Sequence, residues 1–191
     1  MEPSEQKGGG PKERFEVVLA GSGGQGLIVS AMLLCESAIR EGRNVVQTQS
    51  YGIAARGGLS IAELIIDTEE IIFQQVQKPD IILALTGQAM ERFAAFAEKG
   101  ARVFFDTTGM TDRPGLNFLG FPFTKLAGDL NRTNAATLIA LGAMVACTGM
   151  VRMDSLISAV RETFPEAAPA NIEALGLGEG LVASRLREGA G

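Results

Sequence analysis

The chain has 191 residues, of which 46% are hydrophobic and 20% charged, enough for one globular domain with a proper core. Its 17 basic and 22 acidic residues give a net charge of −5 without any basic cluster, so no nucleic-acid partner is expected. The absence of histidine excludes Ser–His and Cys–His nucleophile pairs and imidazole metal ligands. Its two cysteines, Cys35 and Cys147, lie far apart without a C-x-x-C motif, which excludes the usual four-thiolate iron–sulfur site. Buried free thiols at both positions suit a reducing, cytoplasmic compartment.

Two segments bear on targeting and on membrane insertion. Residues 1–13 are polar and glycine-rich and lack the apolar core of a signal peptide, so we expect a disordered tail followed by one domain over residues 14–191. Residues 133–151 carry no charge, but they are rich in Ala, Gly, Thr and Asn and only moderately hydrophobic. This pattern predicts a buried helix with close neighbours rather than a membrane span, and no membrane partner is expected.

Apolar patterns along the chain predict alternating strands and helices. Strands are expected over residues 15–20, 44–48, 59–66, 80–86, 102–106 and 116–121. Helices are expected over residues 25–40, 88–98, 125–130, 133–151, from about 155 to Pro165, and 171–187, with caps at Thr124 and at Asp154 or Ser155. This order predicts an α/β, three-layer, Rossmann-like fold with a largely parallel sheet and helices on both faces. The strands between residues 44 and 66 are compatible with an antiparallel pair, because ten residues leave no room for a crossover helix.

A glycine loop, Gly21-Ser22-Gly23-Gly24-Gln25-Gly26, joins the first strand to the first helix. Its glycines stand at G-x-G-x-x-G spacing, and the first N–H groups of the helix favour an anion such as a phosphate. The end of the second strand, Gln47 to Gln49, lacks the acidic residue that a dinucleotide site uses for the ribose. NAD is therefore disfavoured, and a turn whose glycines only permit close helix–strand packing remains the alternative.

A second loop, residues 49–58, is expected to meet the glycine loop beyond the carboxyl ends of the strands. It carries one cation, Arg56, followed by Gly57 and Gly58, with hydroxyl donors at Ser50, Tyr51 and, just beyond, Ser60. A guanidinium beside glycines suits bidentate binding of a phosphate or carboxylate, and it equally suits an ion pair at a subunit contact.

Few residues are suited to catalysis. Asp106 ends a strand and is either a general base or, as is commoner for such a residue, the cap of the next turn. Ser22 has no base to activate it, and Cys35 is expected to be buried with a raised thiol pKa. We therefore expect no catalytic and no metal-binding residue in this chain.

Further motifs follow the glycine loop in one register, and together they carry a resemblance. They are Val46-Gln47-Thr48-Gln49-Ser50-Tyr51-Gly52, Ala55-Arg56-Gly57-Gly58 with Ser60 and Glu63, Lys78-Pro79-Asp80, Pro122-Phe123-Thr124, and Asn134 to Gly142 leading to Gly149. With them the chain resembles the gamma subunits of 2-oxoacid:ferredoxin (acceptor) oxidoreductases, in the pyruvate/ketoisovalerate oxidoreductase gamma family, over roughly residues 15–187. The 2-oxoglutarate branch is the most similar. Ile53-Ala54 stands where that branch often has Pro-Glu, which leaves the 2-oxoacid open.

The resemblance implies a subunit of an enzyme that converts a 2-oxoacid and coenzyme A to acyl-CoA and CO2 and reduces ferredoxin. Thiamine diphosphate, magnesium and iron–sulfur clusters would lie on alpha, beta and, in some enzymes, delta subunits, and none on this chain alone. The glycine loop and Arg56 would contact coenzyme A or a subunit junction. Two other hypotheses remain: a stand-alone NAD or flavin oxidoreductase, and a purely structural subunit. Related indolepyruvate enzymes have a similar subunit.

Overall fold

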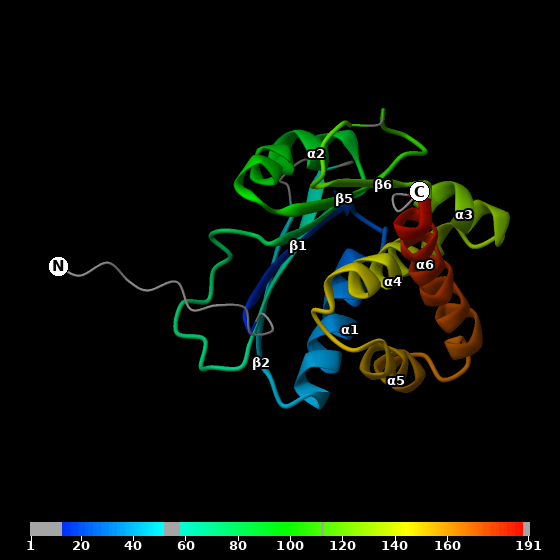
Figure 1. Ribbon diagram of the computed structural model, residues 1–191. Helices are drawn as coiled ribbons and strands as arrows, with labels where there is room; N and C mark the ends of the chain where they lie inside the picture. Colours follow the sequence, from blue (N-terminus) through cyan, green and yellow to red (C-terminus); the bar gives the residue numbers. More distant parts are fainter. Residues whose placement is uncertain (1–12, 52–57, 112, 189–191) are drawn as a thin grey trace.

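The computed structural model describes residues 13–51, 58–111 and 113–188, and its centre is a six-stranded sheet. The strand order is β2-β3-β1-β4-β5-β6 (Figure 1). The strands are β1 (Phe15–Ser22), β2 (Asn44–Tyr51), β3 (Leu59–Asp67), β4 (Ile81–Ala84), β5 (Arg102–Asp106) and β6 (Phe118–Phe121). All the predicted strands are present, although β4 is shorter than expected. The predicted tail lies, except for its last residue, outside the described residues.

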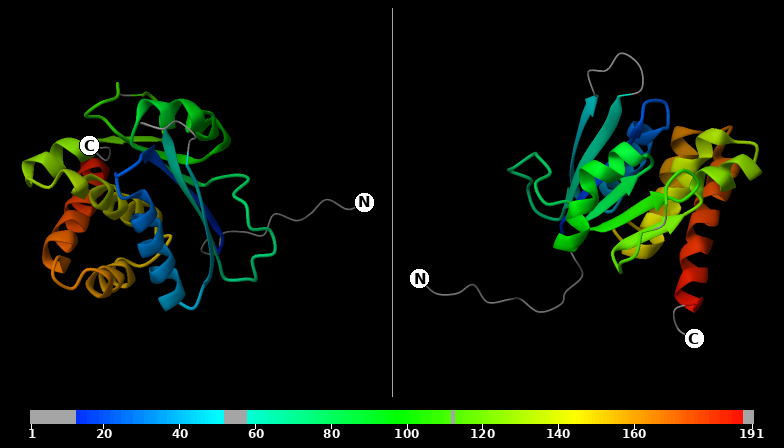
Figure 2. Two further views of the ribbon diagram at one scale, coloured as in Figure 1. Left: turned by 180° about the vertical axis from the view of Figure 1, so that it is seen from behind. Right: turned by 90° about the horizontal axis from the view of Figure 1, so that it is seen from above.

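The helices cover both faces of this sheet, as the alternating pattern predicted (Figures 1 and 2). They are α1 (Leu27–Arg40), α2 (Gly87–Phe93), α3 (Phe123–Asp129), α4 (Ala136–Thr148), α5 (Met153–Thr163) and α6 (Ala168–Glu188), with short 3-10 segments η1 (Ala94–Lys99) and η2 (Thr133–Ala135). Successive side chains of β1 join opposite cores, because strand residues alternate between faces. Val17 and Leu19 join the core shared with α1, α4, α5 and α6, whereas Val18 and Ala20 join the core beneath α2 and η1.

β3 is the strand that departs from the parallel arrangement. It pairs antiparallel with β2, with Val46 opposite Ile65, and antiparallel with β1, with Leu19 opposite Ala62. The remaining pairings, β1 with β4, β4 with β5 and β5 with β6, are parallel. The predicted antiparallel pair is therefore confirmed, and β3 lies between the first two strands of the chain.

α4 is apolar on all sides because it lies between the sheet and α6. A Cβ atom at Gly142 would collide with the carbonyl oxygen of Leu175, and one at Gly178 would collide with that of Ile139. Glycine at these two positions lets the helix backbones approach closely, so Gly178 is a packing residue, whereas Gly176 and Gly180 have open space around them. None of the helices in the described ranges combines the length and the hydropathy needed to cross a membrane.

The predicted helix caps were wrong. α3 begins at Phe123 after Pro122, so Thr124 lies inside the first turn, and α5 begins at Met153 after Arg152. Proline suits the start of α3 because it has no N–H group to leave unpaired. Asp154 lies in the first turn of α5, where its charge complements the helix dipole.

Candidate functional site

The candidate site lies at the carboxyl edge of the sheet, where the loops after β1, β4 and β5 meet the start of α3 and η2. One hollow of about 190 Å³ is lined by Gly24, Gln25, Thr124, Thr133, Asn134, Ala136 and Thr137. A second, of about 200 Å³, is lined by Leu85, Thr86, Gly87, Asp106, Thr108, Gly109, Met110 and Thr124. Thr124 lines both hollows, which makes them neighbours. Their lining is mostly backbone and hydroxyl groups, with Asp106 as the one ionisable side chain among these residues.

The glycines of the first loop have different physical roles. Gly24 and Gly26 have φ values of 87° and 80°, which residues with a side chain rarely adopt, and Gly26 immediately precedes α1. A Cβ atom at Gly21 would displace the flexible end of the Gln25 side chain and lie 3.2 Å from Cβ of Leu85, so glycine there leaves room for the Gln25 side chain. Gly23 has open space around it and no such restriction.

The loop is held in place from inside and from α4. The Ser22 N–H donates to Oε1 of Gln25 at 2.7 Å, so this side chain braces the loop. The hydroxyl of Thr137, in the first turn of α4, donates to the carbonyl oxygen of Gln25. Gly23, Gly24 and Gly26 remain exposed, and their backbone faces the solvent at the start of α1. This geometry suits an anion, whereas Gly21 makes room for a side chain within the loop.

Asp106 has a structural role. Its Oδ1 accepts from the Thr108 N–H at 3.0 Å, and its Oδ2 accepts from the Thr124 N–H at 3.2 Å and from the Thr124 hydroxyl. The carboxylate is only 4% exposed and joins the end of β5 to the start of α3. The turn-capping interpretation is confirmed. Thr124 and Thr137 were missed as site residues, because single hydroxyls in helical segments give no sequence signal.

The ends of the second loop lie beside the glycine loop. Ser60 pairs with Gly21 on one side of β3 and with Tyr51 on the other, and Leu59 pairs with Ser22. Ser60 is buried and Ser50 is exposed. Gly58 is half-buried just before β3. The predicted cation Arg56, the neighbouring Gly57 and the Tyr51 side chain lie outside the described residues.

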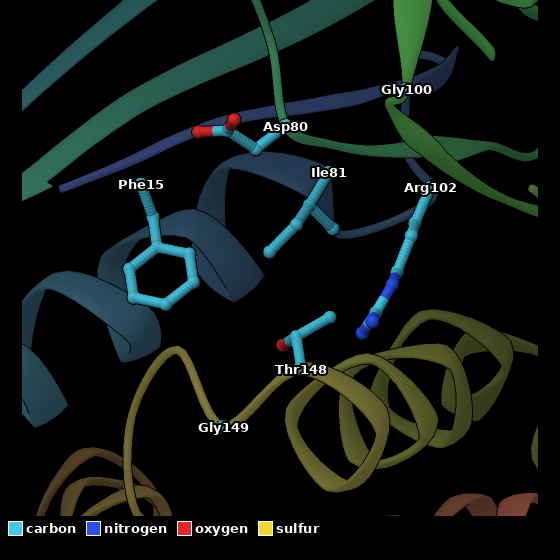
Figure 3. A pocket seen from close by; sticks show the side chains of 7 residues that line it. All are labelled: Phe15, Asp80, Ile81, Gly100, Arg102, Thr148 and Gly149. Carbon is cyan, nitrogen blue, oxygen red and sulfur yellow. The ribbon is translucent and has the colours of Figure 1, made fainter. Parts of the chain in front are cut away.

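A larger hollow, of about 510 Å³, lies at the opposite, amino edge of the sheet (Figure 3). Its lining is Phe15, Asp80, Ile81, Gly100, Arg102, Thr148 and Gly149. Nη1 of Arg102 donates to the carbonyl oxygen of Cys147 at 2.8 Å, and Nη1 of Arg43 donates to that of Met150 at 2.5 Å. Arg102 thus binds the last turn of α4, and Arg43 binds the chain just after the helix. We favour the carboxyl edge as the site despite its smaller hollows, because ligands of such sheets bind there.

The described residues offer little to a metal ion. They contain no group of three or more His, Cys, Asp or Glu side chains that could hold one. Cys35 is buried as predicted, and burial, together with the neighbouring charge of Glu36, raises the pKa of its thiol to about 11. Cys147 is half-exposed rather than buried, because it lies in the last turn of α4.

Comparison with known proteins decides the family. Residues 16–179 match the model of the family "Pyruvate ferredoxin/flavodoxin oxidoreductase". The chain belongs to this family. It is 38% identical over 141 residues to the 2-oxoglutarate synthase subunit KorC of Archaeoglobus fulgidus, covering 73% of each chain.

Solved structures agree. The gamma subunit of a keto/oxoacid ferredoxin oxidoreductase from Geobacter sulfurreducens is 34% identical, with a TM-score of 0.77, over 89% of this chain and 99% of that one. The 2-oxoglutarate:ferredoxin oxidoreductase of Magnetococcus marinus shares the fold, with a TM-score of 0.80 at 21% identity, over 91% of this chain and 32% of that one. The chain is a gamma-type subunit of a 2-oxoacid:ferredoxin oxidoreductase, as its motifs predicted, and the stand-alone oxidoreductase hypothesis is not supported.

Proposed function

We propose that this gamma subunit serves a 2-oxoglutarate-type enzyme, which forms succinyl-CoA and CO2 from 2-oxoglutarate and coenzyme A and reduces ferredoxin. The proposal is supported by the KorC subunits of Archaeoglobus fulgidus and Methanocaldococcus jannaschii, which are 38% and 34% identical. Alpha and beta subunits, with a delta subunit in some enzymes, would supply the rest of the active site.

The redox cofactors do not fit this chain. An iron–sulfur cluster needs several thiolates, and Cys35 and Cys147 lie on different helices, one of them buried with its thiol protonated. The described residues also contain no group of three or more His, Cys, Asp or Glu side chains that could hold a metal ion. We propose that thiamine diphosphate, magnesium and the clusters lie on companion subunits, as the family membership implies.

We further propose that the carboxyl edge contacts coenzyme A. The observation that carries this is the exposed, positive-φ glycine backbone at the start of α1, in one hollow with Thr124, Thr133 and Asn134. Backbone N–H groups and hydroxyls suit phosphate oxygens. Arg56, carried by the loop that joins the ends of β2 and β3, would add a bidentate charge. The Magnetococcus marinus structure with the same fold was solved with 2-oxoglutarate, coenzyme A and succinyl-CoA bound.

The test is Arg56→Ala in the assembled enzyme, with Arg187→Ala at the end of α6 as the matched control. Losing a guanidinium–phosphate contact is expected to raise the KM for coenzyme A about tenfold or more, because charge-assisted hydrogen bonds contribute about 1.5–3 kcal/mol. The KM for 2-oxoglutarate is expected to stay unchanged. Normal assembly with an unchanged KM for coenzyme A would reject the ligand role and leave the purely structural subunit, which the internal brace of Gln25 favours.

A further inference from the structure

An apolar tip, residues 69–75, projects from the connection between β3 and β4. Residues 68–80 form no helix or strand, and in Figures 1 and 2 this segment swings out from the sheet, away from α5 and α6. Ile72 is 89% exposed and Phe73 is 52% exposed, whereas Ile71 beside them is buried. Long connections without secondary structure are uncommon in compact domains and usually serve a function.

The tip is held on both sides. At its first residue, the Glu69 N–H donates to Oδ1 of Asp67 at 3.1 Å, and Nδ2 of Asn44 donates to the Glu69 carbonyl oxygen at 3.0 Å. After it, the N–H groups of Gln77 and Lys78 donate to Oε2 of Glu16 at 2.8 and 2.9 Å. Val76 packs against the core beneath α2. Ile72 and Phe73 are thus presented by an anchored segment and not by a freely moving one.

Charge within the tip is acidic, and the nearest basic residue along the chain after it is Lys78. Glu69 and Glu70 are exposed and have no ion pair among the described residues, and between Thr68 and Gln77 the chain has no basic residue. A surface that covers the tip must therefore accept two large apolar side chains beside two carboxylates. An apolar pocket with lysine or arginine on its rim meets both requirements.

We propose that residues 69–75 are a docking tip that inserts Ile72 and Phe73 into an apolar pocket with a basic rim on a companion subunit of the same oxidoreductase. The inference rests on the proposed function, since it requires such a companion. Large apolar anchors at the centre of an interface carry most of its binding energy, and the charged rim mainly sets the association rate. The tip lies at the amino edge of the sheet, because it links the end of antiparallel β3 to the start of β4, whereas the glycine loop lies at the carboxyl edge.

The test measures binding of the purified full-length chain to its purified companion subunits. Ile72→Gln with Phe73→Gln is compared with Leu186→Gln, which removes a 70%-exposed side chain from the last turn of α6. We expect the tip variant to weaken the Kd about 100-fold, from roughly tenfold for each anchor, and the control to leave it unchanged. Glu69→Gln with Glu70→Gln is expected to slow association several-fold and to reduce its salt dependence.

An unaltered Kd for the tip variant overturns the inference, as does equal weakening by the control. Because Ile72 and Phe73 are exposed, the tip variant should unfold at the wild-type temperature, and this check separates lost docking from misfolding. Tip-dependent self-association of the isolated chain, seen by light scattering, would assign the surface to a second copy and also overturn the inference. If the wild-type chain fails to bind its companions, the proposed function itself fails, which is a distinct result.

Discussion

Replacing Gly178 by alanine tests how closely the backbones of α4 and α6 must approach. A Cβ atom at this position would collide with the carbonyl oxygen of Ile139 and lie 2.7 Å from the backbone nitrogen of Ala143. Neither neighbour is the end of a flexible side chain, so the two helices must move apart. Overpacking of this kind costs about 1–3 kcal/mol, and the backbone contacts place Gly178→Ala near the upper end of that range.

Gly180→Ala is the matched control on the same helix. Nothing lies within 4 Å of a Cβ atom at Gly180, and its φ is not in the left-handed region. Alanine there should stabilise the chain by up to about 1 kcal/mol through helix propensity. The same gain partly offsets the clash at Gly178, so we expect Gly178→Ala to be about 2 kcal/mol less stable than the wild type and about 3 kcal/mol less stable than the control.

Urea unfolding of the purified chain, followed by circular dichroism, measures both variants. A difference of about 3 kcal/mol corresponds to roughly 6–12 °C in Tm for a chain of this size. If Gly178→Ala unfolds with a free energy within about 0.5 kcal/mol of Gly180→Ala, close backbone approach is not what keeps glycine at this position, and our account of the α4–α6 contact is incorrect.

Two further substitutions test the buried carboxylate of Asp106 and the half-buried carboxylate of Glu16. Asp106→Ala leaves the N–H groups of Thr108 and Thr124 without their acceptor, and it should destabilise the chain by about 1–3 kcal/mol in urea unfolding. The control, Asp129→Ala on the exposed side of α3, should have almost no effect on stability. Equal destabilisation by the two variants would contradict the capping role of Asp106. Burial alone would raise the pKa of Glu16, but hydrogen bonds from Lys78 and Gln77 and the guanidinium of Arg14 lower it below its usual 4.5. Its contribution to stability is therefore present above about pH 4.5 and lost as the pH falls through the lowered pKa. Glu16→Gln should flatten the pH dependence of the unfolding free energy in that acid range, and curves parallel to the wild type would refute the assignment.

The buried strands could be predicted from the sequence because each is a short apolar run that only a covered sheet accommodates. Ile81–Ala84 and Arg102–Asp106 are such runs, and the structure places both between neighbouring strands in the interior of the sheet. The place of β3 between β2 and β1 could not be predicted, because its apolar residues pack equally well beside either neighbour. The glycines of α6 were interpreted as weakening a helix, and the close packing of Gly178 was missed because its partner, the backbone of α4, is distant in the chain.

The candidate site also contains residues that could be predicted from the sequence and residues that could not. The glycine loop was predicted because positive φ at Gly24 and Gly26 requires a residue type that is visible in the sequence. Thr124 and Thr137 were not, because their importance comes from the groups they meet, the Asp106 carboxylate and the Gln25 carbonyl oxygen. The predicted cap of α3 was wrong for a related reason. A free N–H group in the first turn of α3 donates to the carboxylate of Asp106, which is distant in the chain, and not to a neighbouring hydroxyl.

The two attachments of α4 have a consequence for whatever meets the glycine loop. Its first turn binds that loop through Thr137, and the chain at and just beyond its far end is bound by Arg102 and Arg43. The helix has 13 residues and is about 20 Å long, and hydrogen bonds hold it near both of its ends. Because the glycine loop is hydrogen-bonded to this helix, it is already ordered in the folded chain. A ligand or subunit that binds the loop therefore loses little binding free energy to ordering it.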